Sequence, residues 1–171
     1  ANNIFLLGAT QPLDLTRTRN AEVGVKQSFW DQRGDWTLAY YDTERRNVYA
    51  AQGGQQLAQA GALKSRGVEA SLALRPDAQW SLWSNLALNR ARYEGYVQAD
   101  GTSFSGHQPP NAPRVIANAG VGYRFVLGVP MQVSASVRHV GDRFHSDANT
   151  VRLKAYTVFD AGLAVDVARG V

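Results

Sequence analysis

Apolar and polar residues alternate along most of the chain, and few windows show the spacing of an amphipathic helix. Alternation of this kind is typical of a strand with one apolar and one polar face. We predict strands at Ala21 to Phe29, Val68 to Leu74, Trp80 to Leu88, Val115 to Phe125, Val133 to Val137 and Phe159 to Val167. With a further strand in Trp36 to Val48, the pattern predicts an all-β fold, an antiparallel up-and-down meander of about seven strands.

The segments between these strands alternate between short and long. The short ones are Asp31 to Gly34, Arg75 to Gln79 and Leu127 to Val129, whereas the long ones are polar and rich in Gly, Pro or Gln: Ala50 to Gly61, Gln98 to Ala112 and Phe144 to Val151. One end of the predicted sheet therefore carries turns and the other carries loops. Transmembrane β-barrels show this asymmetry, with apolar side chains toward lipid and polar or small ones toward the lumen.

Aromatic residues gather near the predicted short turns, as expected for the belt that marks a membrane interface. The expected interface residues are Phe29, Trp30, Trp36, Trp80 and Phe125. About ten tilted residues cross the apolar band, so Arg90, Arg92 and Arg114 are expected at the opposite rim, where anionic lipid headgroups favour arginine.

Composition narrows the class of protein further. The chain has 18 Lys and Arg against 14 Asp and Glu, and these basic residues are scattered rather than clustered, which argues against nucleic-acid binding. The longest apolar stretch, Ile4 to Ala9, is too short for a membrane-spanning helix. The absence of cysteine excludes a disulfide scaffold and a thiolate metal site.

Six short segments together resemble the C-terminal part of the barrel of TonB-dependent outer-membrane receptors of the ferric-siderophore type. These segments are Asn20 to Lys26, Ser65 to Glu69, Pro109 to Arg114, Val140 to Phe144, Asp147 to Thr150 and Tyr156 to Asp160. Each is weak alone, but their order and spacing extend over nearly the whole chain. The resemblance implies a bacterial outer-membrane location and a role in the uptake of ferric siderophores.

The resemblance also implies a larger assembly than this chain. Receptors of this family have a roughly 22-stranded transmembrane β-barrel, filled by an N-terminal plug domain. About seven strands contain neither, so residues 1–171 are expected to be a partial barrel that lacks the plug domain and the final strands. The implied partners are a ferric siderophore, outer-membrane lipid, and the TonB-ExbB-ExbD complex acting through the missing N-terminal part.

No arrangement of residues indicates catalysis. His107, His139 and His145 lie in neither a triad-like nor a metal-ligand spacing. We therefore expect no enzyme, no protein-bound metal and no cofactor, with iron carried only inside the siderophore chelate.

Recognition of an anionic chelate requires aromatic walls and a few cations. In the outer loops and upper lumen, the expected ligand-binding residues are Arg45, Arg46, Tyr49, Tyr93, Tyr96, Phe104, His107, Arg143, Phe144 and His145.

The alternation of side chains leaves one alternative open. An antiparallel sandwich also alternates, so a non-transporting β-protein, either a soluble carbohydrate-binding sandwich or a small structural barrel, is the alternative function.

Glu22 and Lys26 share the polar parity of one strand, and Glu69 has the same parity on another, which predicts ion pairs inside the lumen.

Overall fold

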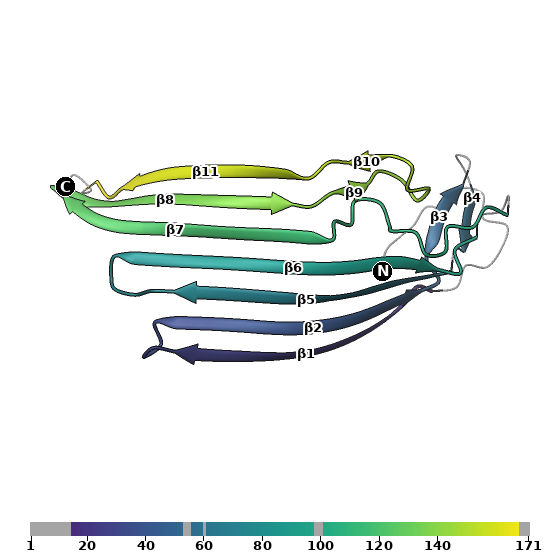
Figure 1. The fold of residues 1–171 in the computed structure, drawn as a ribbon, viewed down its shortest axis with the longest axis horizontal. Coiled ribbons are helices and arrows are strands. Elements are labelled where there is room, and N and C mark those ends of the chain that lie inside the picture. The colour runs from purple at the N-terminus through teal and green to yellow at the C-terminus, as the bar shows by residue number, and fades with distance from the viewer. Residues whose placement is uncertain (1–14, 53–55, 60, 98–100, 168–171) are drawn as a thin grey trace.

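The structure, a computed structural model, describes residues 15–52, 56–59, 61–97 and 101–167. Its main element is a sheet of seven strands in the order β1-β2-β5-β6-β7-β8-β11, in which every neighbouring pair is antiparallel (Figure 1). The strands are β1 (Arg17–Phe29), β2 (Gly34–Arg46), β5 (Ala62–Leu74), β6 (Trp80–Glu94), β7 (Val115–Leu127), β8 (Val129–Val140) and β11 (Tyr156–Val165). The predicted all-β meander of about seven strands is confirmed.

Short turns and long connections segregate to opposite ends of this sheet, as predicted (Figure 1). We call the end with turns 30–33, 75–79 and 128 the turn end, and the end with connections 47–61, 95–114 and 141–155 the loop end. Two long connections contain small antiparallel sheets that the sequence pattern did not predict. These are β3 (Tyr49–Gln52) with β4 (Gln56–Gln59), and β9 (Arg143–Phe144) with β10 (Arg152–Leu153).

The register places the apolar series of successive strands on one face of the sheet. One ladder row runs through Val25, Leu38, Ala70, Leu86 and Ala117, each directly opposite the next. Side chains along a strand alternate between faces, so the positions between these rows form the second, polar face. We call the two surfaces the apolar face and the polar face.

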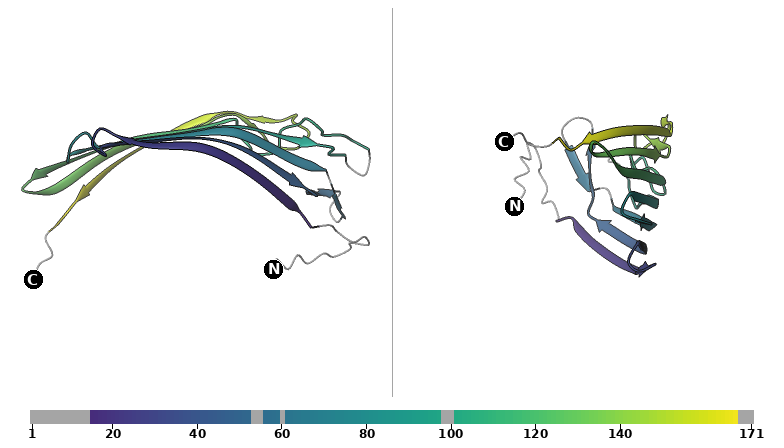
Figure 2. Two further views of the ribbon diagram at one scale, coloured as in Figure 1. Left: turned by 90° about the horizontal axis from the view of Figure 1, so that it is seen from below. Right: turned by 90° about the vertical axis from the view of Figure 1, so that its left-hand side faces the viewer.

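Neither face of the sheet is covered by a second layer. Within the described residues, Ala91, Tyr96 and Val140 are the only buried hydrophobic residues, while Leu163 and Phe159 are 62% and 78% exposed. The sheet is a single curved layer (Figure 2). A β-sandwich needs two sheets packed face to face, so the alternative of a soluble sandwich is wrong for this fold.

The apolar face therefore lacks the protein core that would bury it. An exposed apolar surface of this extent marks contact with lipid or with another macromolecule. Among the described residues, no helix is long and apolar enough to cross a membrane.

Candidate ligand-binding end of the sheet

Within the connection 95–114, residues 104–107 return along the loop end of β6. β7 pairs with β6 only as far as Leu88, so the last part of β6 lacks a neighbouring strand on that side. The returning connection takes that place, because the backbone N–H of Tyr93 donates to His107 O at 3.0 Å and Gly106 N–H donates to Tyr93 O at 2.8 Å. The ladder of β6 is thereby extended by a loop.

Four predicted ligand-binding residues meet in this folded connection. Tyr93 and Tyr96 pack edge to face with ring centroids 4.7 Å apart, and Phe104 lies 5.5 Å from Tyr96 in the same manner. His107 continues the series, 5.5 Å from Phe104. We call these four residues the aromatic cluster. Edge-to-face contacts of this kind stabilise a packed group of rings.

Asp147, from the connection 141–155, anchors the aromatic cluster. Tyr93 Oη donates to Asp147 Oδ1 at 2.8 Å, and Tyr96 Oη lies 3.4 Å from Asp147 Oδ2. His107 Nδ1 lies 2.8 Å from the backbone oxygen of Asp147. Burial and the nearby Asp147 carboxylate raise the pKa of Tyr93, so its hydroxyl stays a donor throughout the physiological range. One acidic residue thus joins two connections far apart in sequence.

A second link between the same connections is formed by Gln108 and Asn149. The Gln108 backbone N–H donates to Asn149 Oδ1, and Asn149 Nδ2 donates back to Gln108 O, both at 2.8 Å. Gln108 is only 8% exposed, and its side-chain amide donates to Ala112 O. Asn149 has a φ of 55°, a left-handed conformation that asparagine adopts more readily than most residues. The two loops are therefore built as one unit.

The burial of Tyr96 assigns it to the packing of the loops. Its side chain is 1% exposed, whereas Tyr93 and His107 are only partly buried. Ligand contact by the members of the aromatic cluster stays a prediction, and Tyr96 is the member least able to make it.

Arg143 lies beside this unit. Its guanidinium carbon is 5.5 Å from the ring centroid of Tyr156, a cation–π arrangement. Tyr156 belongs to the polar face, because it lies opposite Val140, which lies opposite Ile116. The Nη1 atom of Arg143 is buried and has no hydrogen-bond partner among the described residues. Phe144 and His145 follow it in the chain, and His145 N–H donates to Val151 O at 2.9 Å.

Alternation places Arg45 and Arg46 on opposite faces of β2, and the register shows which face each one occupies. Arg45 lies opposite Leu63, and Leu63 lies opposite Tyr93, so Arg45 shares a polar-face row with the aromatic cluster. Arg46 lies on the other face and forms an ion pair with Glu44, with Nε to Oε1 at 3.0 Å. The backbone of Tyr49 lies in β3, and its side chain falls outside what the structure describes.

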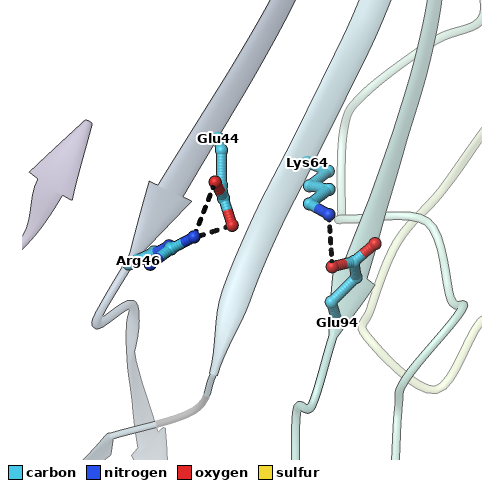
Figure 3. A network of polar contacts seen from close by, with 4 residues as sticks. All are labelled: Glu44, Arg46, Lys64 and Glu94. Atoms are coloured by element: carbon cyan, nitrogen blue, oxygen red, sulfur yellow. Dashed lines mark hydrogen bonds and ion pairs between the residues drawn. The ribbon is translucent and has the colours of Figure 1, made fainter. Parts of the chain in front are cut away.

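Charged residues occupy the apolar face beyond its last apolar row at the loop end. Figure 3 shows two ion pairs there, Glu44 with Arg46, and Lys64 with Glu94, the latter at 2.8 Å. The hydrogen bond from Arg46 lowers the pKa of Glu44, and the hydrogen bond to Glu94 raises the pKa of Lys64. Arg90 and Arg92 lie on this face beyond the apolar band, as predicted for the rim.

The aromatic residues expected at a membrane interface lie at or near the turn end, and their place at that interface stays a prediction. Trp80 and Phe125 lie on the apolar face with Tyr123 between them, at centroid distances of 4.6 and 5.9 Å from Tyr123. The sequence prediction missed Tyr123 as a belt residue, although its parity marked it. Phe29 lies on the same face at the end of β1, and Trp30 lies in the following turn. Trp36 also lies on this face, in the next ladder row toward the loop end.

The polar face carries hydroxyl and amide side chains that bond across strands. Thr37 and Ser71 hydroxyls are 2.5 Å apart, and Ser65 Oγ donates to Asn89 Oδ1 at 2.8 Å. The predicted ion pairs of Glu22, Lys26 and Glu69 do not occur among the described residues. Four positions along a strand span about 13 Å, so Glu22 and Lys26 are too far apart to pair with each other.

Two further observations concern the polar face and metal binding. Trp83 lies on the polar face with its indole over Gly120, a contact that the sequence pattern did not predict. No group of His, Cys, Asp or Glu in the described part of the chain is arranged to hold a metal ion.

Comparison with known proteins identifies the sheet. Residues 2–171 match the family model described as TonB dependent receptor-like, beta-barrel. The chain belongs to this family. Its single curved sheet is therefore part of an outer-membrane β-barrel, with the apolar face toward lipid and the polar face toward the lumen.

Individual relatives and structures agree with this assignment. The chain is 27% identical over 147 residues to the ferrioxamine receptor of Yersinia enterocolitica and 25% identical over 158 residues to the ferrichrome outer membrane transporter/phage receptor of Escherichia coli K12. These matches cover 85% and 90% of the chain but 20% of each relative, so the chain spans about a fifth of their length.

Solved structures show the same fold. The ferric yersiniabactin uptake receptor of Yersinia pestis matches with a TM-score of 0.74 at 21% identity, over 86% of this chain and 22% of its own. A siderophore receptor of Acinetobacter baumannii matches with a TM-score of 0.72 at 23% identity, over 89% of this chain and 22% of its own.

Proposed function

We propose that the protein containing this chain imports ferric siderophores across the outer membrane in a TonB-dependent manner. The observation that carries the proposal is the family match over residues 2–171, together with relatives named as ferrioxamine and ferrichrome receptors or transporters. Both named relatives handle iron chelates, and neither is named as an enzyme. In this proposal the protein is no enzyme, needs no cofactor of its own, and receives iron only as the chelate.

The role of this chain within that activity is to supply part of the outer, ligand-facing end of the barrel. The two connections 95–114 and 141–155 are joined by Asp147, and a fixed loop pair loses less conformational freedom on binding than separate mobile loops. Arg45, Tyr93, His107 and Arg143 are the residues of this end that we propose to contact the chelate.

Arg143 is the strongest single candidate for an anionic ligand. Its buried Nη1 has no partner in the described structure, and the Tyr156 ring orients the guanidinium. The guanidinium forms no ion pair among the described residues, and an anionic oxygen of the chelate at its exposed part would form charge-assisted hydrogen bonds with it.

Uptake by intact cells tests the proposal. We expect cells with the gene to accumulate ⁵⁵Fe from ferrioxamine, ferrichrome or another member of a broad ferric-siderophore panel under iron limitation. Deletion of the gene, or loss of TonB or ExbB-ExbD, should abolish this accumulation. Equal uptake of every chelate by the deletion strain and its parent would contradict the proposal.

A further inference from the structure

Residues 104–107 form a tight turn that carries two members of the aromatic cluster. His107 N–H donates to Phe104 O at 2.9 Å, so the two rings lie at the ends of this turn. Gly106 has a φ of 85°, a left-handed conformation that favours glycine. Contacts that hold the backbone at Gly106 therefore also determine where Phe104 and His107 lie.

Arg92 holds this turn from the membrane side of the sheet. It lies on the apolar face, six positions along β6 from Leu86. Its Nη1 atom donates to Gly106 O at 2.5 Å, and its Nε atom is buried, so the side chain lies against the protein. Glu94, on the same face, pairs with Lys64 at 2.8 Å (Figure 3). The contact of Arg92 is thus with the loop.

Arg114 holds the adjoining residue of the same segment, Gln108. Arg114 Nε donates to Gln108 Oε1 at 3.3 Å, while the other polar groups of Gln108 bond to Asn149 and Ala112. A buried amide oxygen without a donor is costly, and Arg114 supplies the donor for this one. Asn89 N–H donates to Arg114 O at 2.9 Å, which fixes Arg114 to β6.

Arg90 shows that such contacts are not general for the arginines of this end. It lies on the same face as Arg92, two positions away on β6, yet it makes no hydrogen bond or ion pair within the described residues. The sequence pattern predicted Arg90, Arg92 and Arg114 at the rim by one argument. The structure separates the two that bond to the loop from the one that does not.

We propose that Arg92 and Arg114 are positioning residues of the ligand-binding end, which hold residues 106–108 and thereby place Phe104 and His107 for contact with the ferric chelate. Both act on atoms of the loop, through hydrogen bonds whose charged donors make them stronger than neutral ones. Neither arginine needs to touch the chelate. The inference rests on the proposed function, because chelate contact by His107 is part of that proposal.

Amide hydrogen exchange of the natural gene product, purified in detergent, tests the hold on the loop. Arg92→Gln and Arg114→Gln should each speed exchange in residues 104–108 roughly fivefold, from the loss of one charged donor at a partly exposed site. Arg90→Gln is the matched control, because it removes the same charge from the same face as Arg92→Gln, and it should leave exchange unchanged. Arg92→Lys keeps a charged donor and should partly restore slow exchange.

Chelate binding tests whether this hold serves the ligand site. The chelate that supports uptake should bind Arg92→Gln and Arg114→Gln roughly fivefold more weakly. In a Phe104→Ala/His107→Ala background, the same arginine substitutions should have little further effect, since they act through these two rings. The losses should be equal in nanodiscs of zwitterionic and of anionic lipid, because both hydrogen bonds are internal to the protein.

Several results would overturn the inference. They are unchanged exchange in both arginine variants, an equal change in Arg90→Gln, and a full further loss of affinity in the background that lacks both rings. Losses seen only in anionic lipid would also overturn it, because they would assign the two arginines to the lipid surface. If the unaltered protein binds no ferric siderophore of the panel while exchange still depends on both arginines, the proposed function is wrong and their hold on the loop is confirmed.

Discussion

The hydroxyl of Tyr93 donates a hydrogen bond of 2.8 Å to the carboxylate of Asp147, across 54 positions of sequence. Tyr93 ends its strand next to one long connection, and Asp147 lies in the middle of another. The bond therefore makes the conformation of each loop depend on the other. A ligand site at this end then depends on the conformation of both loops.

Tyr93→Phe should loosen both connections without disturbing the sheet. The ring contacts are kept, but the hydrogen bond to a charged group is lost, which costs about 1.5–3 kcal/mol at a buried site and less at this half-buried one. We expect faster amide hydrogen exchange in 95–114 and 141–155 and weaker chelate binding. Tyr123→Phe is the matched control, because the Tyr123 hydroxyl has no hydrogen bond among the described residues and should show neither effect.

Arg143→Gln should weaken binding of an anionic ferric chelate about tenfold or more, as expected for loss of a charge-assisted contact. Arg143→Lys keeps the charge but not the planar contact with Tyr156, so an intermediate affinity is expected. The quantity to measure is the Kd from fluorescence quenching with the chelate that supports uptake. Arg152→Gln removes an exposed arginine that pairs with Asp142 and serves as the control. Unchanged affinity in Arg143→Gln would remove this residue from the proposed site.

Gly120→Ala should destabilise the barrel, because a Cβ at this position would lie 2.6 Å from the Trp83 indole. Overpacking of this kind costs about 1–3 kcal/mol. Gly122→Ala is the matched comparison on the same strand and face, where the added Cβ meets the Ser81 hydroxyl, which can rotate away. Urea unfolding from phosphatidylcholine vesicles should rank Gly122→Ala above Gly120→Ala in stability, and the reverse order would contradict the assignment of Trp83.

Trp80→Leu should lower the unfolding free energy by about 1 kcal/mol beyond the loss of buried area, because it removes the ring contact with Tyr123. Trp30→Leu makes the same replacement at a turn residue without a ring partner in the described structure, and we expect a smaller effect. The same vesicle unfolding experiment measures both. Equal losses would show that the belt acts through interface affinity alone.

The alternation of side chains predicted most of the fold, because the two faces of a curved sheet in a membrane appear in the sequence with a period of two. The alternation places Val25, Leu86 and Ala117 on the apolar face of their strands, and the register confirms this by bringing all three into one ladder row. Pattern alone did not reveal which charges face the membrane. Arg45 and Arg46 are neighbours in a strand and therefore lie on opposite faces, but the ladder is needed to show which of the two lies on the polar face.

The loop end was predictable in composition but not in arrangement. The aromatic residues were identified from their place in long polar segments, yet the importance of Asp147, Gln108 and Asn149 depends on contacts between two distant connections. No local pattern marks such contacts. The β3–β4 and β9–β10 pairs were missed for a related reason, since four-residue and two-residue strands are too short to show alternation.

Cysteine labelling in intact cells tests the central claim, that the strands cross the outer membrane with the loop end outside. The chain contains no cysteine, so single substitutions within it give an unambiguous signal from these positions. Ser105→Cys at the loop end should react with a membrane-impermeant maleimide on intact cells, whereas Ala78→Cys at the turn end should react only after the outer membrane is permeabilised. Labelling of Ala78→Cys but not Ser105→Cys on intact cells, or equal labelling of both, would contradict the account.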